Sequence, residues 1–170
     1  MESNQQHRVK RNDELGRISI DEFKTSKKLP ISIVLDNVRS QHNIGSVFRT
    51  ADSFIMEKIY LCGICAVPPS AEIHKSALGA EFSMEWEYCK ETLNAVKKLK
   101  ENGYCIISIE QAENSVSLNN LKTILKNSEL KNIFNNKIAL VFGNEVKGVS
   151  QYVVNESHYV LEIPQFGKKH

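Results

Sequence analysis

The apolar residues of this chain fall into two kinds of segment that alternate along its length. Short, nearly continuous apolar runs, rich in Ile, Val, Leu and Tyr, occupy residues 31–35, 58–64, 104–110, 137–142 and 158–163. Such runs, with little strict alternation, are typical of strands that are covered on both faces, as in a parallel sheet. Segments in which apolar residues recur at steps of three and four, the spacing of a helix, cover residues 44–55, 90–103 and 149–155.

This order predicts one α/β domain over residues 30–170, with a mostly parallel sheet and helices on both of its faces. A long loop is expected over residues 68–86, and a further helix is expected between residues 110 and 137. In open sheets of this kind, ligands bind beyond the carboxyl ends of the strands. The residues with unusual chemistry fall at such ends.

Residues 1–29 form a different segment, a polar N-terminal arm with charges of both signs. The stretch "DELGRISIDEFKTSKKL" is consistent with a short helix that packs on the domain. A solvated arm and an arm that contacts RNA are the alternatives.

Composition and charge narrow the class of protein. The chain has 170 residues, a formal net charge of +2 and a pI near 8.3, which permits a nucleic-acid partner without requiring one. No apolar run is long enough to cross a bilayer and the N-terminus does not resemble a signal peptide, so we expect a cytoplasmic protein with no membrane partner. Cys62 and Cys65 form a CxxC pair, but no second pair follows at metal-binding spacing. We therefore expect reduced core thiols and no metal.

The first candidate site is "NVRSQHNIGSVFRTAD", residues 37–52, directly after a predicted strand. Asn43 is predicted to cap the following helix, and Gly45 lies in its first turn. Arg49, four residues further on, is expected to lean back over Gly45, because helical side chains point toward the N-terminus. An amide, backbone N–H groups and a guanidinium would then converge on one spot that suits a phosphate. The alternative is a capped core helix with a surface arginine.

The second candidate site is "LVFGNEVKGVS", residues 140–150. Gly143 and Gly148 have the spacing of a P-loop, but the Lys-Ser/Thr that must follow is absent, and no GxGxxG follows a strand. Glu145 could accept hydrogen bonds from Asn43 or Arg49 if the two strand ends are neighbours. A glycine-rich turn with an exposed acid is the alternative. In the tail, "LEIPQFGKKH", Pro164 should end regular strand pairing.

Together these three stretches resemble the SpoU (TrmH-like) family of RNA ribose 2′-O-methyltransferases in the SPOUT superfamily. "PPSAEIHKSALGAEFSMEW" is also similar to a long loop of that family. The resemblance implies methyl transfer from S-adenosylmethionine to a 2′-hydroxyl of tRNA or rRNA, with catalytic residues Asn43, Arg49 and Glu145. It also implies that main-chain groups at Gly143 and Ile163 hold the cofactor, with Glu110 a further candidate by its position. The residues expected to contact RNA are Arg49, Lys24, Lys27, Lys28, Lys168 and Lys169.

The resemblance stops short of the family's third motif. In the family that motif continues with a Ser-Leu-Asn stretch and a C-terminal helix, which thread a trefoil knot and build much of a homodimer interface. This sequence ends at His170, about where that stretch should begin. We therefore expect weak cofactor binding by these residues alone, and a homodimer when the C-terminal segment is present. A non-catalytic RNA-binding module of the same fold is the alternative function.

The general base is the open point of the implied mechanism. The family proposal makes the first-motif arginine the base, but a guanidinium is a pure hydrogen-bond donor. Positioning a phosphate and stabilising an oxyanion is the better role for Arg49. His42, His74 and His158 are candidate bases, and His42 is the one to test because it adjoins Asn43.

Overall fold

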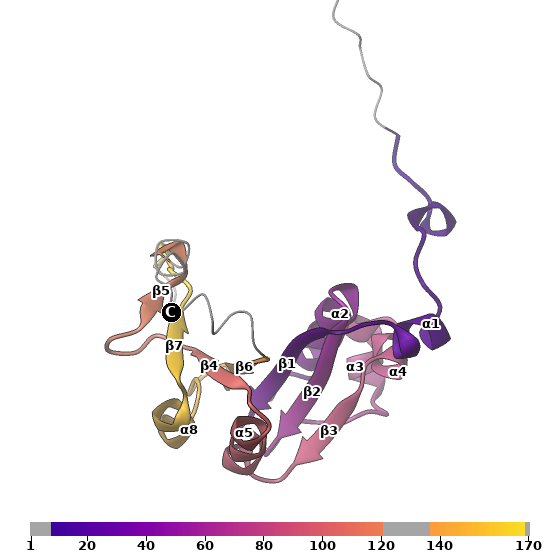
Figure 1. The fold of residues 1–170 in the computed structure, drawn as a ribbon. Helices are drawn as coiled ribbons and strands as arrows, with labels where there is room; N and C mark the ends of the chain where they lie inside the picture. The colour runs from indigo at the N-terminus through magenta and orange to yellow at the C-terminus, as the bar shows by residue number, and fades with distance from the viewer. Residues whose placement is uncertain (1–7, 121–136, 169–170) are drawn as a thin grey trace, which may run out of the picture.

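The structure is a computed structural model, which describes residues 8–120 and 137–168. Its centre is a seven-stranded sheet with the order β3-β2-β1-β6-β4-β7-β5, in which neighbouring strands run parallel (Figure 1). The strands are β1 (Leu29–Asp36), β2 (Met56–Cys62), β3 (Trp86–Cys89), β4 (Cys105–Ile109), β5 (Val116–Ser117), β6 (Ile138–Phe142) and β7 (Tyr159–Glu162). The α-helices are α1 (Ile20–Thr25), α2 (Gln41–Ser53), α3 (Ala71–Ala77), α4 (Ala80–Ser83), α5 (Thr92–Glu101) and α8 (Gln151–Glu156), and short 3-10 helices cover Asn12–Leu15 and Leu118–Asn120.

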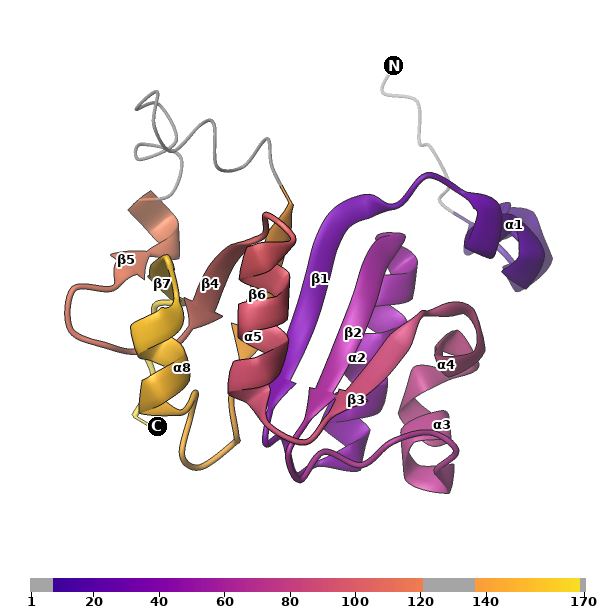
Figure 2. The ribbon, with the colours of Figure 1, turned by 60° about the horizontal axis from the view of Figure 1, so that its bottom comes forward.

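Helices cover both faces of the sheet, as predicted, and each face has its own apolar core. Figure 2 shows α5 and α8 in front of the sheet and α2 behind it. Because successive strand residues point to opposite faces, Ile33 and Leu35 of β1 pack with α2, whereas Val34 packs with α5 and α8. The runs are continuous in the sequence because both of these faces are buried. The predicted fold class is confirmed.

The structure also corrects the expected long loop over residues 68–86. This stretch contains α3 and α4, and Trp86 begins the edge strand β3. The two helices have only seven and four residues, too short to show a helical period in the sequence. They are held by tertiary packing, because Ile73 and Ala77 of α3 and Met84 after α4 are buried in the core beside α2. The helix expected between residues 110 and 137 falls largely on residues 121–136, which lie outside the described part of the chain.

The N-terminal arm contains the short helix expected as one of three alternatives. Ser19 caps α1, since its side chain accepts from the Glu22 N–H and the Glu22 carboxylate accepts from the Ser19 N–H. Phe23 is the buried residue of this helix and joins the core on the α2 face of the sheet. This one side chain therefore docks the arm on the domain.

Close contact between α2 and α3 explains why residue 45 is a glycine. A Cβ atom built on Gly45 would lie 2.1 Å from Ser76 Oγ and 2.4 Å from the Ile73 carbonyl oxygen. The hydroxyl can turn away, but the carbonyl is helix backbone and cannot. Gly45 is therefore required for the approach of the two helices, and α3, not Arg49, covers it. The prediction that Arg49 lies over Gly45 was wrong. The atoms that lie against Gly45 come from α3, a helix about 30 residues further along the chain, and not from the next turn of α2.

Substituting Gly45 with Ala should separate α2 from α3. We expect Gly45→Ala to lower the free energy of unfolding by about 1–3 kcal/mol, the usual cost of overpacking. Urea unfolding followed by circular dichroism measures this difference. Gly167→Ala is the matched control, since a Cβ at Gly167 meets nothing within 4 Å. Equal stability of the two variants would contradict the packing role of Gly45.

Candidate active site

The two motif stretches meet because β1 and β6 are neighbours in the sheet. Leu35 of β1 pairs with Phe142 of β6, so the loops that leave these strands start at the same edge. Residues 37–40 lead from β1 into α2, and residues 143–150 lead from β6 into α8. The sequence analysis expected Glu145 to reach Asn43 or Arg49 only if these two strand ends are neighbours, and they are.

The Glu145 carboxylate joins these two loops. It accepts hydrogen bonds from the backbone N–H groups of Arg39 at 3.0 Å and Ser40 at 2.9 Å, and from Asn43 Nδ2 at 3.0 Å. We call this set of contacts the Glu145 clasp. Partial burial raises the pKa of the Glu145 carboxyl, but the three hydrogen bonds outweigh that effect and bring the pKa below its ordinary value of 4.5. The expected contact with Asn43 is present, and Arg49 takes no part in it.

Asn144 shapes the loop that presents Glu145, a role that the sequence analysis missed. Its Oδ1 accepts from the N–H groups of Val146 and Lys147, and its backbone exchanges two hydrogen bonds with Gly148. Its Nδ2 donates to the carbonyl oxygen of Asn37 at 2.8 Å. Asn144 thus closes its own turn and ties it to the end of β1. An Asn next to a Gly was the available signal, because Asn side chains commonly bond to the backbone of their own turn.

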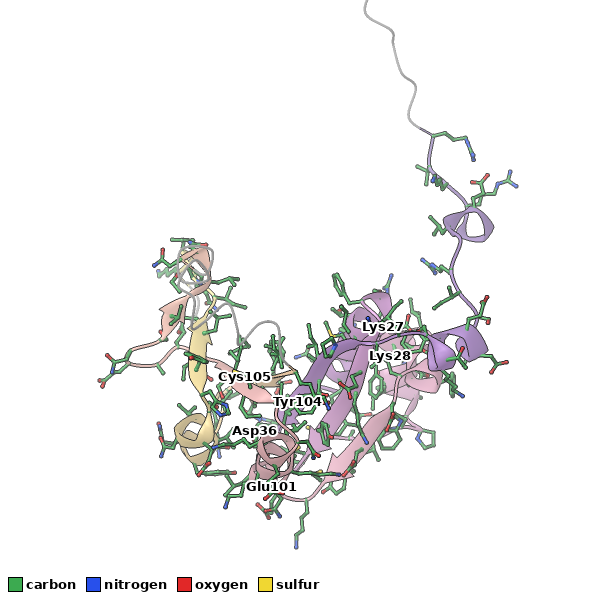
Figure 3. All side chains as sticks on the ribbon, in the orientation of Figure 1. Lys27, Lys28, Asp36, Glu101, Tyr104 and Cys105 are labelled. Atoms are coloured by element: carbon green, nitrogen blue, oxygen red, sulfur yellow. The ribbon has the colours of Figure 1, made fainter. Side chains whose placement is uncertain are left out.

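Asp36 is a second carboxylate that the sequence analysis missed. It is fully buried at the end of β1, near α5 (Figure 3). Its Oδ1 accepts from Thr92 Oγ1 at 2.6 Å, and its Oδ2 accepts from the Ser150 N–H at 2.7 Å. It therefore fixes the starts of α5 and α8 to the central strand, as a buried acid must be paired to be tolerated.

The start of α2 differs from the prediction. Ser40, not Asn43, is the N-cap: its side chain accepts a hydrogen bond from the Asn43 N–H at 3.2 Å, and the helix begins at Gln41. Asn43 lies in the first turn instead, where its amide is free to bond to Glu145. The sequence "SQHN" offers two residues that can cap a helix, and the tertiary contact with Glu145 decides between them.

Arg49 lies in a separate groove between α2 and α3. The groove, of about 480 Å³, is lined mostly by polar and basic side chains. We call it the basic groove, with lining residues His42, Ser46, Arg49, Thr50, Lys75 and Ser76 among others. Arg49 is six residues beyond Asn43 on α2, a rise of about 9 Å. The two were expected to converge on one spot; in the structure Asn43 is hydrogen-bonded to Glu145, whereas Arg49 lines the groove. The Arg49 side chain is exposed and has no hydrogen-bond or ion-pair partner within residues 8–120 and 137–168.

A known protein family matches most of this chain. The family model described as the SpoU rRNA Methylase family matches residues 30–170. This chain belongs to that family.

Relatives of this SpoU family chain are RNA methyltransferases by name. A Staphylococcus saprophyticus protein, named for the TrmH family of tRNA/rRNA methyltransferases, is 26% identical over 144 residues, which make up 85% of this chain and 53% of that protein. The chain thus spans about half the length of the curated relatives it matches. An AdoMet-bound rRNA methyltransferase from Sinorhizobium meliloti has the same fold, with a TM-score of 0.69 and 24% identity over 91% of this chain and 54% of that one. The TrmH/SpoU tRNA modifying enzyme of A. aeolicus gives a TM-score of 0.70 at 19% identity, over 88% of this chain and 70% of that one.

The three residues expected to hold the cofactor lie at one edge of the sheet of this SpoU family chain. Ile109 of β4 pairs with Phe142 of β6 and with Leu161 of β7, so Glu110, Gly143 and Ile163 follow three adjacent strand ends. A Cβ at Gly143 would meet the backbone of the Gly148–Val149 turn at 2.1 Å. The Glu110 carboxylate accepts from the N–H groups of Val149 at 2.7 Å and Gln111 at 2.8 Å. Gly143 and Glu110 are therefore both committed to closing the turn that carries Glu145.

The candidate bases occupy three different environments. His42 is exposed and lines the basic groove with Arg49. His74 pairs with the Glu81 carboxylate. His158 accepts a hydrogen bond from the Ile106 N–H at its Nδ1, while burial and the charge of Lys100 lower its pKa. The His158 ring is therefore used as a neutral hydrogen-bond acceptor for β4, just before the start of β7. His42 is the histidine that lines the basic groove together with Arg49.

The basic residues expected to bind RNA are dispersed. Lys24 and Lys27 are exposed, and Lys27 lies beside Lys28 just before β1, at the edge of the sheet opposite to Glu145 (Figure 3). Lys28 is partly buried: its Nζ lies 3.2 Å from the centre of the Phe23 ring and donates to the Phe23 carbonyl oxygen. Lys28 therefore closes the end of α1 and is not free for RNA in this conformation. Lys168 is exposed after β7, and Lys169 lies outside the described residues.

The cysteines show no sign of a metal centre. Cys62 and Cys65 are buried, and burial raises the pKa of both thiols. In the described part of the chain, no cluster of three or more His, Cys, Asp or Glu side chains could hold a metal ion. No helix among the same residues is long and apolar enough to cross a membrane.

The Glu145 clasp should make stability depend on pH. Because the folded pKa of Glu145 is lowered, its contribution is fully present above the ordinary pKa of 4.5 and is lost as the pH falls through the lower, folded value. We expect Glu145→Gln to be less stable than the parent chain at pH 7, with the difference shrinking toward pH 3. Urea unfolding at a series of pH values measures it. Glu101→Gln is the control, since Glu101 is exposed at the far end of α5 (Figure 3). A difference that does not change with pH would contradict the clasp.

Proposed function

We propose that this SpoU family chain transfers a methyl group from S-adenosylmethionine to a ribose 2′-hydroxyl of tRNA or rRNA. The observation that carries the proposal is Arg49, an exposed arginine in a basic groove that has no side-chain partner among the described residues, on a helix whose start is fixed by Glu145. Membership of the family supports methyl transfer to RNA. The motif residues Asn43, Arg49 and Glu145 support the ribose as its target.

Arg49 is proposed to bind and orient the RNA phosphate next to the reacting ribose. A guanidinium binds phosphate through two parallel hydrogen bonds and remains protonated throughout. Lys75, across the groove on α3, adds a second positive charge, although its Nζ also pairs with the exposed Glu72 carboxylate at 2.6 Å. Glu145 and Asn43 act at a distance from the phosphate, by fixing the N-terminal turn of α2. They are positioning residues for Arg49 in this mechanism.

The 2′-hydroxyl must lose its proton as its oxygen forms the bond to the methyl carbon. Arg49 cannot accept that proton, because its guanidinium has no free acceptor site. His42 lines the same groove, is exposed, and carries an imidazole, the side chain that most often serves as a general base. We therefore propose His42 as the general base, within a site that orients the hydroxyl for attack.

S-adenosylmethionine supplies the methyl group when it is bound. Gly143 and Ile163 are proposed to hold its adenosyl part through their main-chain groups, at the edge formed by β6 and β7. Ile163 is half exposed there and offers an apolar surface to a base. Glu110 is proposed to act indirectly, because its carboxylate is occupied by the backbone of the Gly148–Val149 turn.

We also propose a cytoplasmic location and, with the family's C-terminal segment, a homodimer.

The second candidate function is an RNA-binding module without catalysis. The basic groove favours it to the same degree as the enzyme, because Arg49 and Lys75 would bind phosphate in either case. The two functions differ in one measurable property, the appearance of a methylated nucleoside. Incubation with labelled S-adenosylmethionine and bulk tRNA and rRNA, followed by nucleoside mapping, separates them, and a label on a base instead of the ribose would contradict the 2′-O target.

Arg49→Ala should abolish methyl transfer while leaving cofactor binding largely intact, because Arg49 lines the groove between α2 and α3 and is not one of the residues proposed to hold the cofactor after β6 and β7. Arg49→Lys should also fail, since a point charge does not reproduce the planar fork of a guanidinium. Labelled methyl transfer and titration calorimetry measure the two properties. Arg17→Ala, at an exposed arginine before α1, is the control. Loss of cofactor binding together with methylation in Arg49→Ala would refute this division of roles.

RNA affinity should fall steeply as salt rises, because the proposed contacts are to phosphates. Removing one contact with Lys75→Ala should lower the slope of log K against log salt by about 0.7 for single-stranded RNA. Lys98→Ala is the control: like Lys75, which pairs with Glu72, Lys98 is ion-paired, with Glu87, but it lies on the α5 side of the sheet and does not line the groove. Fluorescence anisotropy of labelled RNA gives the slopes. If Lys75→Ala and Lys98→Ala have the same slope, the groove is not the RNA contact.

A further inference from the structure

A second pocket lies on the other side of α3 from the basic groove, between α3, α4 and the edge strand β3. Figure 1 shows these three elements together at one end of the sheet. The pocket has a volume of about 600 Å³ and mostly apolar walls; we call it the aromatic pocket, with lining residues Pro68, Pro69, His74, Glu81, Phe82 and Trp86. None of these residues belongs to the Glu145 clasp or to the basic groove.

Glu81 is the unusual member of the aromatic pocket. Its side chain is only 4% exposed. Oε1 pairs with His74 Nδ1, but Oε2 is buried without a hydrogen-bond partner in the described part of the chain. Ser32 Oγ is the one other buried side-chain atom there without a partner, and it is a neutral hydroxyl within β1. A carboxylate oxygen without a partner among apolar walls is costly, so a hydrogen-bond donor on a ligand would stabilise this carboxylate.

The walls around Glu81 are flat and aromatic. Phe82 is 61% exposed, and its ring centre lies 6.0 Å from that of His74 at an interplanar angle of 55°. Trp86 lines the same pocket from the start of β3. Exposed aromatic surfaces of this kind stack on the unpaired bases of single-stranded RNA, whose edges are then available for hydrogen bonds. A planar ligand that carries an N–H donor fits both features of the pocket.

We propose that the aromatic pocket binds an unpaired nucleobase of the RNA substrate, with the Glu81 carboxylate accepting a hydrogen bond from the exocyclic amino group of the base. This inference rests on the proposed function. Lys75 lines the basic groove and His74, the preceding residue of α3, lines the aromatic pocket. An RNA strand that crosses the exposed face of α3 can place a phosphate on one side and a base on the other.

The Glu81 carboxylate should make the pocket bind cytosine and uracil with different affinities. Cytosine presents its N4 amino group to a carboxylate, which is a favourable pairing. Uracil has a carbonyl oxygen at that position. Its N3–H group is the one donor on the same edge, but it lies between two carbonyl oxygens that repel a carboxylate. The two pyrimidines are similar in size and stacking, so their difference reports on Glu81. The pocket should therefore prefer cytosine to uracil.

Trp86 is the one tryptophan of the chain, so intrinsic fluorescence reports directly on the pocket. Short oligocytidylate should quench it and bind about fivefold or more tightly than oligouridylate of the same length. Glu81→Gln should bring the ratio of the two affinities close to one, since an amide presents both a donor and an acceptor. Phe82→Ala should weaken both by about fivefold or more through lost stacking. Tyr152→Ala, an exposed aromatic on α8, is the matched control and should change neither.

The outcomes separate this inference from the proposed function. RNA binding that depends on Arg49 but leaves Trp86 unquenched would overturn the aromatic pocket alone. Quenching that is selective for cytosine and depends on Glu81, without any methyl transfer, would support the pocket and count against the enzyme. Equal affinity for the two oligonucleotides, or quenching that follows protein concentration without RNA because a second copy fills the pocket, would overturn the inference.

Discussion

One carboxylate, that of Glu145, holds together two loops that are about a hundred residues apart in the chain. It binds the backbone N–H groups at the entry of α2, where the helix dipole and unpaired donors favour a negative charge. Asn144 and Gly148 close the turn that presents it, and Glu110 holds the turn from the neighbouring strand end. This contact fixes the first turn of α2, the helix that carries Arg49, and core packing and α3 hold the rest of the helix.

The parallel sheet is what makes the clasp possible. Parallel strands bring the ends of β1, β6, β4 and β7 to one edge, and buried Asp36 anchors the starts of α5 and α8 there. On the other face, Gly45 lets α3 approach α2, which creates the basic groove on one side of α3. The aromatic pocket occupies the other side. A single short helix thus separates the proposed phosphate contact from the proposed base contact.

The sequence predicted what depends on local pattern and on strand order. The five apolar runs are strands, and the meeting of Asn43 with Glu145 follows from the adjacency of parallel strand ends. It did not predict what depends on distant packing. The partner of Gly45 is on α3, a helix too short to show a period, and Ser40 is the cap because Glu145 engages Asn43. The burial of Glu81 depends in the same way on α3 and α4, so an oxygen without a partner among the described residues could not be read from the sequence.

The most direct test of the central claim is the RNA affinity of Glu145→Ala compared with the parent chain. The substitution removes a negative charge beside a site for a polyanion, so electrostatics alone would strengthen binding. If Glu145 acts by positioning α2 and Arg49, binding is instead weakened, and Arg49→Ala combined with Glu145→Ala is no weaker than Arg49→Ala alone. Tighter binding by Glu145→Ala, or losses from the two substitutions that simply add, would contradict the account.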